Sequence, residues 1–225
     1  MDQPSPAPPA LNRIQGNWLA ASERRLLTWL CARMPAWVTP DKLTALGMVG
    51  AVMVFAGYLA SNLGTIWLAL SIAGYAVQWF GDSMDGSLAR YRKIERPSYG
   101  YFIDHSCDGL ANLLIVAGIG LSPFVTMDVA MIALAGYLLM SIHAFLSARV
   151  LGEFRLSYAA AGPTELRLML IAMTVLMMLV GTGHTVIGRI SGFDLFVGAI
   201  GAILIVLFVV QTIVIGRQLA LSERR

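Results

Sequence analysis

Charged residues are scarce in this chain, and their scarcity excludes an ordinary soluble domain. Asp, Glu, Lys and Arg make up 13% of the 225 residues, whereas hydrophobic residues make up 57%. Soluble domains carry roughly 25% charged residues. Long runs without charge recur at the length needed to cross a hydrocarbon core about 30 Å thick. We therefore expect an all-α integral membrane protein, because lipid cannot satisfy exposed backbone polar groups.

Cysteine is scarce as well, and the chain has neither internal repeats nor low-complexity segments. Cys31 and Cys107 are the two cysteines, and two are too few for a zinc framework. Both are expected on or near the cytoplasmic side of the membrane, where thiols stay reduced. The sequence therefore predicts one domain without a disulfide, with Cys107 as a packing residue.

Three segments follow one another along the chain. Residues 1–10 are rich in proline, which predicts a disordered tail. Residues 11–35 carry apolar side chains at helical spacing with charges between them, which predicts an amphipathic helix in the membrane interface. A cleaved signal peptide is disfavoured because charges interrupt the apolar run. Residues 36–225 are expected to form six transmembrane helices, over 41–61, 66–90, 99–121, 126–149, 165–182 and 194–215.

Basic residues are distributed unequally between the two ends of these helices. One side holds only Arg189, and the other side holds the remaining fifteen. The fifteen are Arg13, Arg24, Arg25, Arg33, Lys42, Arg90, Arg92, Lys93, Arg96, Arg149, Arg155, Arg167, Arg217, Arg224 and Arg225. Because basic residues favour the cytoplasmic side, we expect a protein of the cytoplasmic (inner) membrane with both termini in the cytoplasm.

Four aspartates stand at the cytoplasmic ends of the second and third predicted transmembrane helices. Asp82 and Asp85 are three residues apart and Asp104 and Asp108 are four apart, so each pair shares one face of its helix. A carboxylate within a membrane costs roughly 3 kcal/mol and usually has a function and a partner. The spacing therefore indicates a site between the two helices.

The residue types at this site favour a divalent cation. Gly86 and Ala89 lie on the same face as Asp82 and Asp85 and leave room beside them. Oxygen ligands with space for phosphate suit Mg²⁺ or Mn²⁺, and the pattern indicates metal-assisted phosphoryl transfer. Two alternatives stay open at this point. The acids would pair with nearby arginines at a solvated helix end, or they would line the pathway of a divalent-cation transporter.

The full motif resembles the signature of the CDP-alcohol phosphotransferases, also called CDP-alcohol phosphatidyltransferases. Its eight positions are Asp82, Asp85, Gly86, Ala89, Arg90, Gly100, Asp104 and Asp108. The resemblance implies an enzyme of phospholipid biosynthesis that moves a substituted phosphate group from a CDP-alcohol to an acceptor hydroxyl and releases CMP. It also implies two divalent cations, a lipid as one of the two substrates, no nucleic acid, and a homodimer. Residues 36–225 would then be the catalytic domain.

The resemblance also assigns roles to the motif residues. It implies that Asp82, Asp85, Asp104 and Asp108 hold the metal ions. Gly86 and Ala89 would let the cytidine nucleotide lie against the helix, although small residues also suit close helix packing. A bidentate arginine suits phosphate geometry, so Arg90 would hold the pyrophosphate. Gly100 belongs to the same nucleotide set, but we expect it to serve packing. Gln78 and Asn112 extend the two polar stripes inward.

Two elements resemble the cholinephosphotransferase and ethanolaminephosphotransferase branch of the family. One is Asp104-His105-x2-Asp108, which leaves Asp108 and His105 both open as the general base, with a preference for Asp108. The other is Gly162-Pro163-Thr164-Glu165, for which a turn with Thr164 as helix cap is the plainer interpretation. Tyr101 departs from that branch, which commonly has glutamate there. These elements favour a donor in which CDP carries a small headgroup and the acceptor is a lipid hydroxyl. The alternative, in which CDP-diacylglycerol is the donor and a small polar alcohol is the acceptor, stays open.

Overall fold

The computed structural model describes residues 12–13, 20–151, 153–154, 163–182, 185–187 and 190–223. Within these residues the chain is almost entirely helical. The helices are α1 (Ala20–Arg33), α2 (Pro40–Ala60), α3 (Leu68–Arg92), α4 (Pro97–Leu121), α5 (Met127–Leu151), α6 (Pro163–Val180) and α7 (Gly192–Ser222). Two 3₁₀ turns, η1 (Ser61–Leu63) and η2 (Thr65–Trp67), connect α2 to α3. The prediction of an all-α membrane protein is confirmed.

Short strands occur only at the connections within the described part of the chain. β1 (Asn12–Arg13) pairs in parallel with β2 (Glu153–Phe154), and β3 (Thr185–Ile187) pairs with antiparallel β4 (Ile190–Ser191). The predicted helix over residues 11–35 is therefore wrong at Asn12–Arg13, because their backbone pairs with the segment after α5. The helix begins at Ala20. The predicted tail over residues 1–10 lies outside the described residues.

Four of the described helices are long and apolar enough to cross a membrane. They are α2 with η1 (Pro40–Leu63), α4, α5 and α7. The remaining two predicted spans correspond to α3 and α6 and stay predictions. Helix ends agree with the predicted ranges to within a few residues, except that α7 continues to Ser222 instead of ending at 215. Arg217 and Gln218 are good helix formers, so the helix continues beyond the end of its apolar segment.

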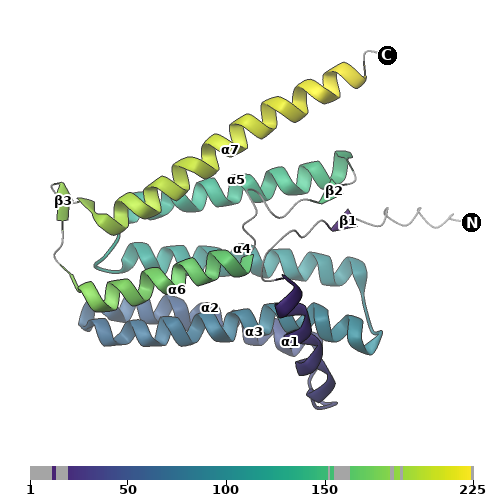
Figure 1. The fold of residues 1–225 in the computed structure, drawn as a ribbon, viewed down its shortest axis with the longest axis horizontal. Coiled ribbons are helices and arrows are strands. Elements are labelled where there is room, and N and C mark those ends of the chain that lie inside the picture. Colours follow the sequence, from purple (N-terminus) through teal and green to yellow (C-terminus); the bar gives the residue numbers. More distant parts are fainter. Residues whose placement is uncertain are drawn as a thin grey trace, which may run out of the picture.

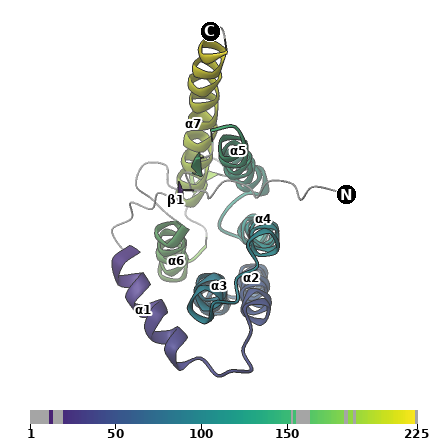
Figure 2. The ribbon, with the colours of Figure 1, turned by 90° about the vertical axis from the view of Figure 1, so that its right-hand side faces the viewer.

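Helices α2 to α6 run along the long axis of the molecule, and α1 lies across one end of it (Figure 1). Figure 2 looks along the bundle from that end and shows α1 beside α3 and α6. α1 contributes Cys31 to an apolar cluster with Leu43, Met84 and Leu88. Burial raises the pKa of the Cys31 thiol, which keeps it neutral. α7 diverges from the bundle toward the C-terminus (Figure 1).

Glycines bring α2 and α3 into close contact. A Cβ on Gly81 would lie 2.6 Å from Cα of Gly47, and one on Gly74 would lie 2.7 Å from the backbone nitrogen of Val54. Side chains at these positions would force the two helices apart, as at other membrane helix interfaces built from small residues. The contact places the C-terminal half of α3 directly beside the start of α2. Thr39 caps that start by accepting from the backbone N–H of Lys42.

A buried chain of hydroxyl groups holds α6 against α2 and α3. The Tyr58 hydroxyl lies 2.6 Å from Thr174 Oγ1 and 3.2 Å from the Tyr75 hydroxyl. All three side chains are fully buried. Apolar side chains of α2 to α7 surround them in one core cluster. Since a buried hydroxyl without a partner is costly, these contacts favour one position of α6 along the bundle.

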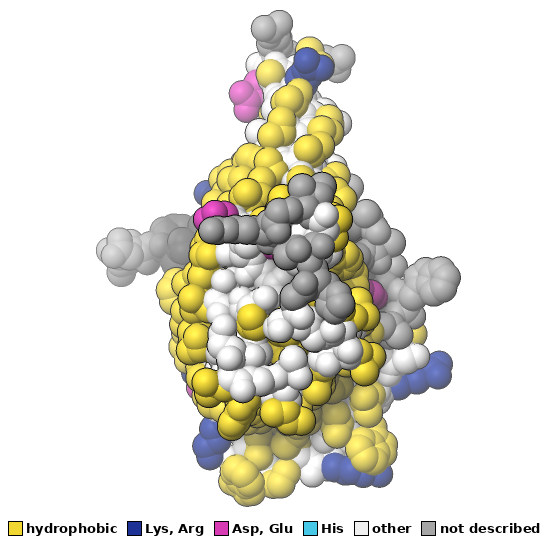
Figure 3. All heavy atoms as spheres, turned by 90° about the vertical axis from the view of Figure 1, so that its left-hand side faces the viewer, with side chains coloured by type: hydrophobic (Ala, Val, Ile, Leu, Met, Phe, Trp, Pro, Cys, Tyr) yellow, Lys and Arg dark blue, Asp and Glu magenta, His cyan; other side chains and the backbone are white. Residues whose placement is uncertain are grey.

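Charge is concentrated at the end of the bundle where α1 lies. The described Lys and Arg side chains lie on α1, near the start of α2, α4 or α6, or near the end of α3, α5 or α7. These helix ends point toward the same end of the molecule because successive helices run in opposite directions (Figure 1). At the opposite end, hydrophobic side chains and atoms of the backbone or of uncharged side chains cover most of the face, and Lys and Arg side chains are visible only at its margins (Figure 3).

Candidate active site

The four aspartates of the sequence motif lie together in the structure. Asp82 and Asp85 from α3 and Asp104 and Asp108 from α4 line one small cavity. The cavity is completed by residues of the same two helices and of α2: Thr44, Gly47, Met48, Gln78, Cys107 and Ala111. Cys107, expected to be a packing residue, thus borders the acidic site.

Asp85 is held by α2. Thr44 Oγ1 donates to Oδ2 of Asp85 at 2.7 Å, and the backbone N–H of Gly86 donates to Oδ1 at 2.5 Å. The carboxylate is buried, so these contacts fix its orientation. Sequence reasoning did not identify Thr44. Thr44 lies one turn into α2, and nothing in the sequence around it indicates that its partner is Asp85 on α3.

Asp82 is held by α6. Arg167 donates from Nη2 to Oδ2 of Asp82 and from Nε to Oε1 of Gln78, the latter at 2.6 Å. The Arg167 and Asp82 side chains are 13% and 24% exposed, so this ion pair is shielded from solvent. In the sequence, Arg167 was counted only among the fifteen basic residues that predict the orientation. A cation near a helix N-terminus is opposed by the helix dipole, and this was the available signal that Arg167 has an acidic partner.

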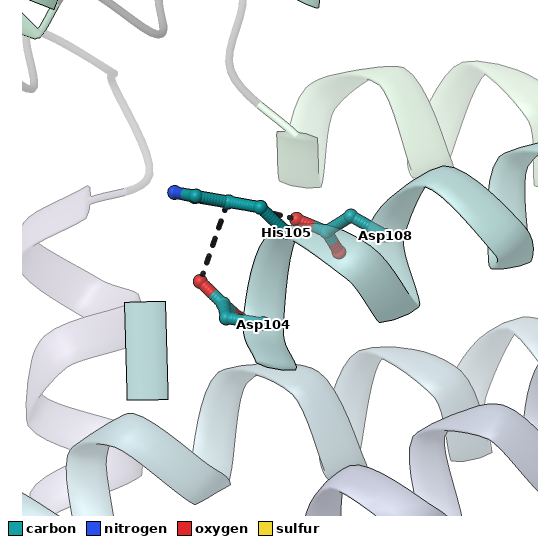
Figure 4. A group of neighbouring side chains, drawn as sticks. All are labelled: Asp104, His105 and Asp108. Carbon is teal, nitrogen blue, oxygen red and sulfur yellow. Dashed lines mark ion pairs between the residues drawn. The ribbon is translucent and has the colours of Figure 1, made fainter. Parts of the chain in front are cut away.

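His105 lies between the two aspartates of α4 (Figure 4). Its Nδ1 is 3.7 Å from Oδ2 of Asp104 and 3.7 Å from Oδ2 of Asp108. The ring packs edge-on against Tyr101, with centroids 4.3 Å apart, and also contacts Phe145 on α5. Asp104, His105 and Asp108 each offer one ligand atom within 4.8 Å of the others. His105 is thus held next to both carboxylates.

The basic residues that follow the motif on α3 are engaged elsewhere. Arg92 donates to the backbone carbonyls of the α1–α2 connection, at Met34, Pro35 and Val38. Arg96 pairs with Asp41 and stacks on the ring of Tyr99. Arg90 donates to Ser87 Oγ at 3.3 Å. The alternative of a helix end whose acids pair with these arginines is therefore wrong, and the arginine on Asp82 comes from α6.

A larger cavity of about 990 Å³ adjoins the acidic site. Every motif residue lines it, together with His105, Gln78, Asn112 and Arg167. Its lining combines the charged side chains of the motif with apolar side chains, among them Leu27, Ile115 and Leu170. A volume near the upper limit for small-molecule pockets, lined by both charged and apolar side chains, suits an amphipathic ligand.

Small motif residues border this cavity without packing against another helix. A Cβ on Gly86 would meet only the Arg90 side chain, at 3.3 Å, and a Cβ on Gly100 would meet no described atom within 4 Å. The expectation that Gly100 serves helix packing is therefore wrong. Ala89 and Arg90 also line the cavity, so the proposed nucleotide residues share one open wall.

Glu23 and Thr164 lie near the acids and were not identified from the sequence as site residues. Glu23 on α1 accepts from the indole Nε1 of Trp79 at 2.9 Å and from Thr164 Oγ1 at 3.0 Å. Thr164 lies inside α6, which begins at Pro163, so the predicted Thr164 helix cap is wrong. Gly162 lies outside the described residues.

Divalent cations fit the residues that are present. Four carboxylates face one cavity, and Arg167 offsets the charge of one of them. The donor atoms are mainly carboxylate oxygens, which hard cations prefer. Thr44 and Arg167 orient two of the four carboxylates, as partners of metal ligands commonly do. The chemistry of this set therefore matches the predicted metal site.

Comparison with known proteins identifies the group to which this fold and site belong. The family model described as CDP-alcohol phosphatidyltransferase matches residues 37–214. This range contains α2 to α6, most of α7 and the whole acidic motif. The chain belongs to the CDP-alcohol phosphatidyltransferase family. The resemblance inferred from the motif is thereby confirmed.

Relatives within this family carry more than one activity in their names. The chain is 27% identical to cholinephosphotransferase 1 of Danio rerio, and the match covers 48% of this chain and 32% of that protein. It is 33% identical to phosphatidylinositol phosphate synthase of Cutibacterium acnes, covering 40% of this chain and 41% of the relative. Archaetidylinositol phosphate synthase of Methanothermobacter thermautotrophicus is 27% identical over 59% of this chain and 64% of its own length. The chain thus spans about a third of the cholinephosphotransferase and less than two thirds of each of these relatives.

Proposed function

We propose that this chain is an integral-membrane phosphotransferase of phospholipid biosynthesis that acts on a CDP-alcohol. The observation that carries the proposal is the meeting of Asp82, Asp85, Asp104 and Asp108 in one cavity beside a large amphipathic chamber. Membership of the CDP-alcohol phosphatidyltransferase family supports the same reaction class. A transferase whose substrates include a polar nucleotide and a lipid needs both charged and apolar lining residues, and this chamber has both.

Each group of residues has a task in the proposed site. Asp82, Asp85, Asp104 and Asp108 would hold two Mg²⁺ or Mn²⁺ ions, which would neutralise charge on the phosphates. Arg90 binds the pyrophosphate, and Gly86, Ala89 and Gly100 leave space for the cytidine nucleotide. These roles follow the motif and agree with the position of all four residues along the cavity wall.

The reaction forms one bond and breaks one bond at the β-phosphorus of the CDP-alcohol. Asp108 takes the proton of the acceptor hydroxyl, and the acceptor oxygen bonds to phosphorus. The bond between this phosphorus and the CMP oxygen breaks, and CMP leaves. His105 remains the other candidate for the base, since its Nδ1 lies 3.7 Å from Oδ2 of Asp108. Asp108 is preferred because it also borders the small acidic cavity.

The proposed topology has six transmembrane helices, α2 to α7, preceded by the interfacial helix α1. The concentration of Lys and Arg at one end supports a cytoplasmic position for both termini and for the active site, in the cytoplasmic (inner) membrane. Donors with a nucleotide head would reach the acids from that side. A homodimer is expected from the family resemblance, and the mass of the purified detergent complex tests it.

The donor is proposed to carry a small headgroup, with a lipid hydroxyl as acceptor. The Asp104-His105-x2-Asp108 element and the match to cholinephosphotransferase support this direction. The matches to the two inositol phosphate synthases support the reverse direction, in which CDP-diacylglycerol is the donor. Testing CDP-choline, CDP-ethanolamine and CDP-diacylglycerol against a lipid extract decides between them.

Release of CMP tests the reaction class. Membranes that contain the wild-type protein, Mg²⁺ or Mn²⁺, a CDP-alcohol and lipid extract should release CMP. Asp85→Asn should abolish release and leave the protein in the membrane, because the substitution removes one ligand charge. Asp128→Asn is the matched control, since Asp128 is exposed in the first turn of α5 at the other end of the bundle. Full turnover by Asp85→Asn would refute the assignment, and a divalent-cation transporter would release no CMP with any donor.

A further inference from the structure

The first turns of α6 are tied to two other helices by polar contacts. Thr164 Oγ1 lies 3.0 and 3.2 Å from the two carboxylate oxygens of Glu23 on α1 and donates to that carboxylate. Three residues later, Arg167 donates to Asp82 and Gln78 on α3. Residues three apart lie on the same face of a helix. The position of the Arg167 guanidinium therefore follows the position of Thr164.

Glu23 also accepts hydrogen bonds from two residues of α3 that flank Asp82 in the sequence. Its Oε1 accepts from Trp79 Nε1 at 2.9 Å and from Ser83 Oγ at 3.5 Å. Trp79 and Ser83 are one helical turn apart on α3, and Asp82 lies between them in the sequence. One half-buried carboxylate thus joins α1, α3 and α6 around a proposed metal ligand.

Hydrogen bonds can fix the direction of a side chain that apolar packing alone does not fix. Apolar contacts are non-directional, so they constrain the direction of a polar side chain less than a hydrogen bond does. Hydrogen bonds are short and directional, so they select one position. The N-terminus of α6 disfavours the charge of Arg167 through the helix dipole. A second contact at Thr164 would therefore help to keep Arg167 on Asp82.

We propose that Glu23 and Thr164 form a clamp that positions α6, and that the clamp acts through Arg167 on the orientation of Asp82 at the metal site. The inference rests on the proposed function, because that function makes Asp82 a metal ligand. Arg167 occupies Oδ2 of Asp82, so the direction of this carboxylate depends on where α6 places the guanidinium. Glu23 and Thr164 are positioning residues, and the interfacial helix thereby tunes the affinity for the cation.

Thermal unfolding of the purified full-length protein in detergent, with increasing Mn²⁺, measures that affinity without turnover. Thr164→Val should raise the Mn²⁺ concentration for half-maximal stabilisation by up to about tenfold, because Thr164 acts one contact further from the metal than direct partners of ligands, whose loss costs about 10- to 100-fold. Thr164→Ser should restore it. Thr126→Val is the matched control, because Thr126 Oγ1 donates to the Asp194 carboxylate at 3.0 Å at the far end of the bundle. It should lower the unfolding temperature without changing the Mn²⁺ midpoint.

A double substitution separates the clamp from a general loss of stability. In the Glu23→Ala background, Thr164→Val should have little further effect on the Mn²⁺ midpoint, because its acceptor is already gone. An unchanged midpoint in Thr164→Val, or equal shifts in Thr164→Val and Thr126→Val, would overturn the clamp while wild-type CMP release upholds the proposed function. A wild-type protein that neither gains stability from Mn²⁺ nor releases CMP would overturn both.

Discussion

Two of the four aspartates are held by residues from helices other than their own. Thr44 on α2 donates to Asp85, and Arg167 on α6 donates to Asp82. A carboxylate that already accepts a hydrogen bond is oriented before an ion arrives, so less freedom is lost on binding. Such partners commonly change metal affinity by about 10- to 100-fold. The residues that hydrogen-bond to the acids are therefore expected to affect the proposed reaction through the affinity for the cation.

Thr44→Val tests this argument at a single hydroxyl group. Valine has nearly the shape of threonine, so the substitution removes the 2.7 Å bond to Asp85 and a longer contact of 3.2 Å with the backbone carbonyl of Pro40. The Mg²⁺ concentration for half-maximal CMP release should rise by about 10- to 100-fold. Thr44→Ser keeps the hydroxyl and should stay near the wild-type value. An unchanged Mg²⁺ requirement in Thr44→Val would show that Asp85 is oriented by other contacts.

The four aspartates could be predicted from the sequence, but their partners could not. Helical spacing shows which residues share a face of one helix, and it located all four acids. It does not show which helices become neighbours. The contacts of Thr44 with Asp85 and of Arg167 with Asp82 join residues 41 and 85 positions apart. Glycine contacts and buried hydroxyl groups determine those neighbours, and they leave no periodic signal.

At the scale of whole helices, the contact between α2 and α3 determines where the acids of α3 lie. Gly47 and Gly81 allow the two backbones to approach closely, immediately before Asp82 in the sequence. Long apolar runs predicted the existence of these helices well, because length and hydropathy alone define them. The start of α1 was predicted poorly, since the backbone of residues 12–13 pairs with a distant segment.

Gly81→Ala should separate α2 from α3. The new Cβ would lie 2.6 Å from Cα of Gly47, where neither backbone can yield easily. Overpacking of this kind costs about 1–3 kcal/mol, and the unfolding temperature in detergent should fall by several degrees. Gly109→Ala on α4 is the control, since no described atom lies within 4 Å of its Cβ position. It should be neutral or stabilising because alanine favours helices. Equal stability of the two variants would contradict the close contact.

At the scale of the whole molecule, charge and chemistry gather at the same end. The end that carries α1 holds the described Lys and Arg side chains and also the four aspartates. Basic residues direct the orientation of a membrane protein, whereas the acids are proposed to bind a cation and, through it, a nucleotide. Two independent features of the sequence therefore converge on one side of the membrane. This agreement supports the proposal that the substrates reach the site from the cytoplasm.

Reporter fusions in bacteria test that orientation directly. Fifteen of the sixteen basic residues are assigned to one side, so a green fluorescent protein fused after Arg225 should fluoresce, and alkaline phosphatase fused there should be inactive. Alkaline phosphatase fused after Gly181, between α6 and α7, should be active because that connection lies at the opposite end of the bundle. Active phosphatase at the C-terminus would place the acids outside the cell, away from cytoplasmic nucleotides, and the proposed reaction would lose its donor.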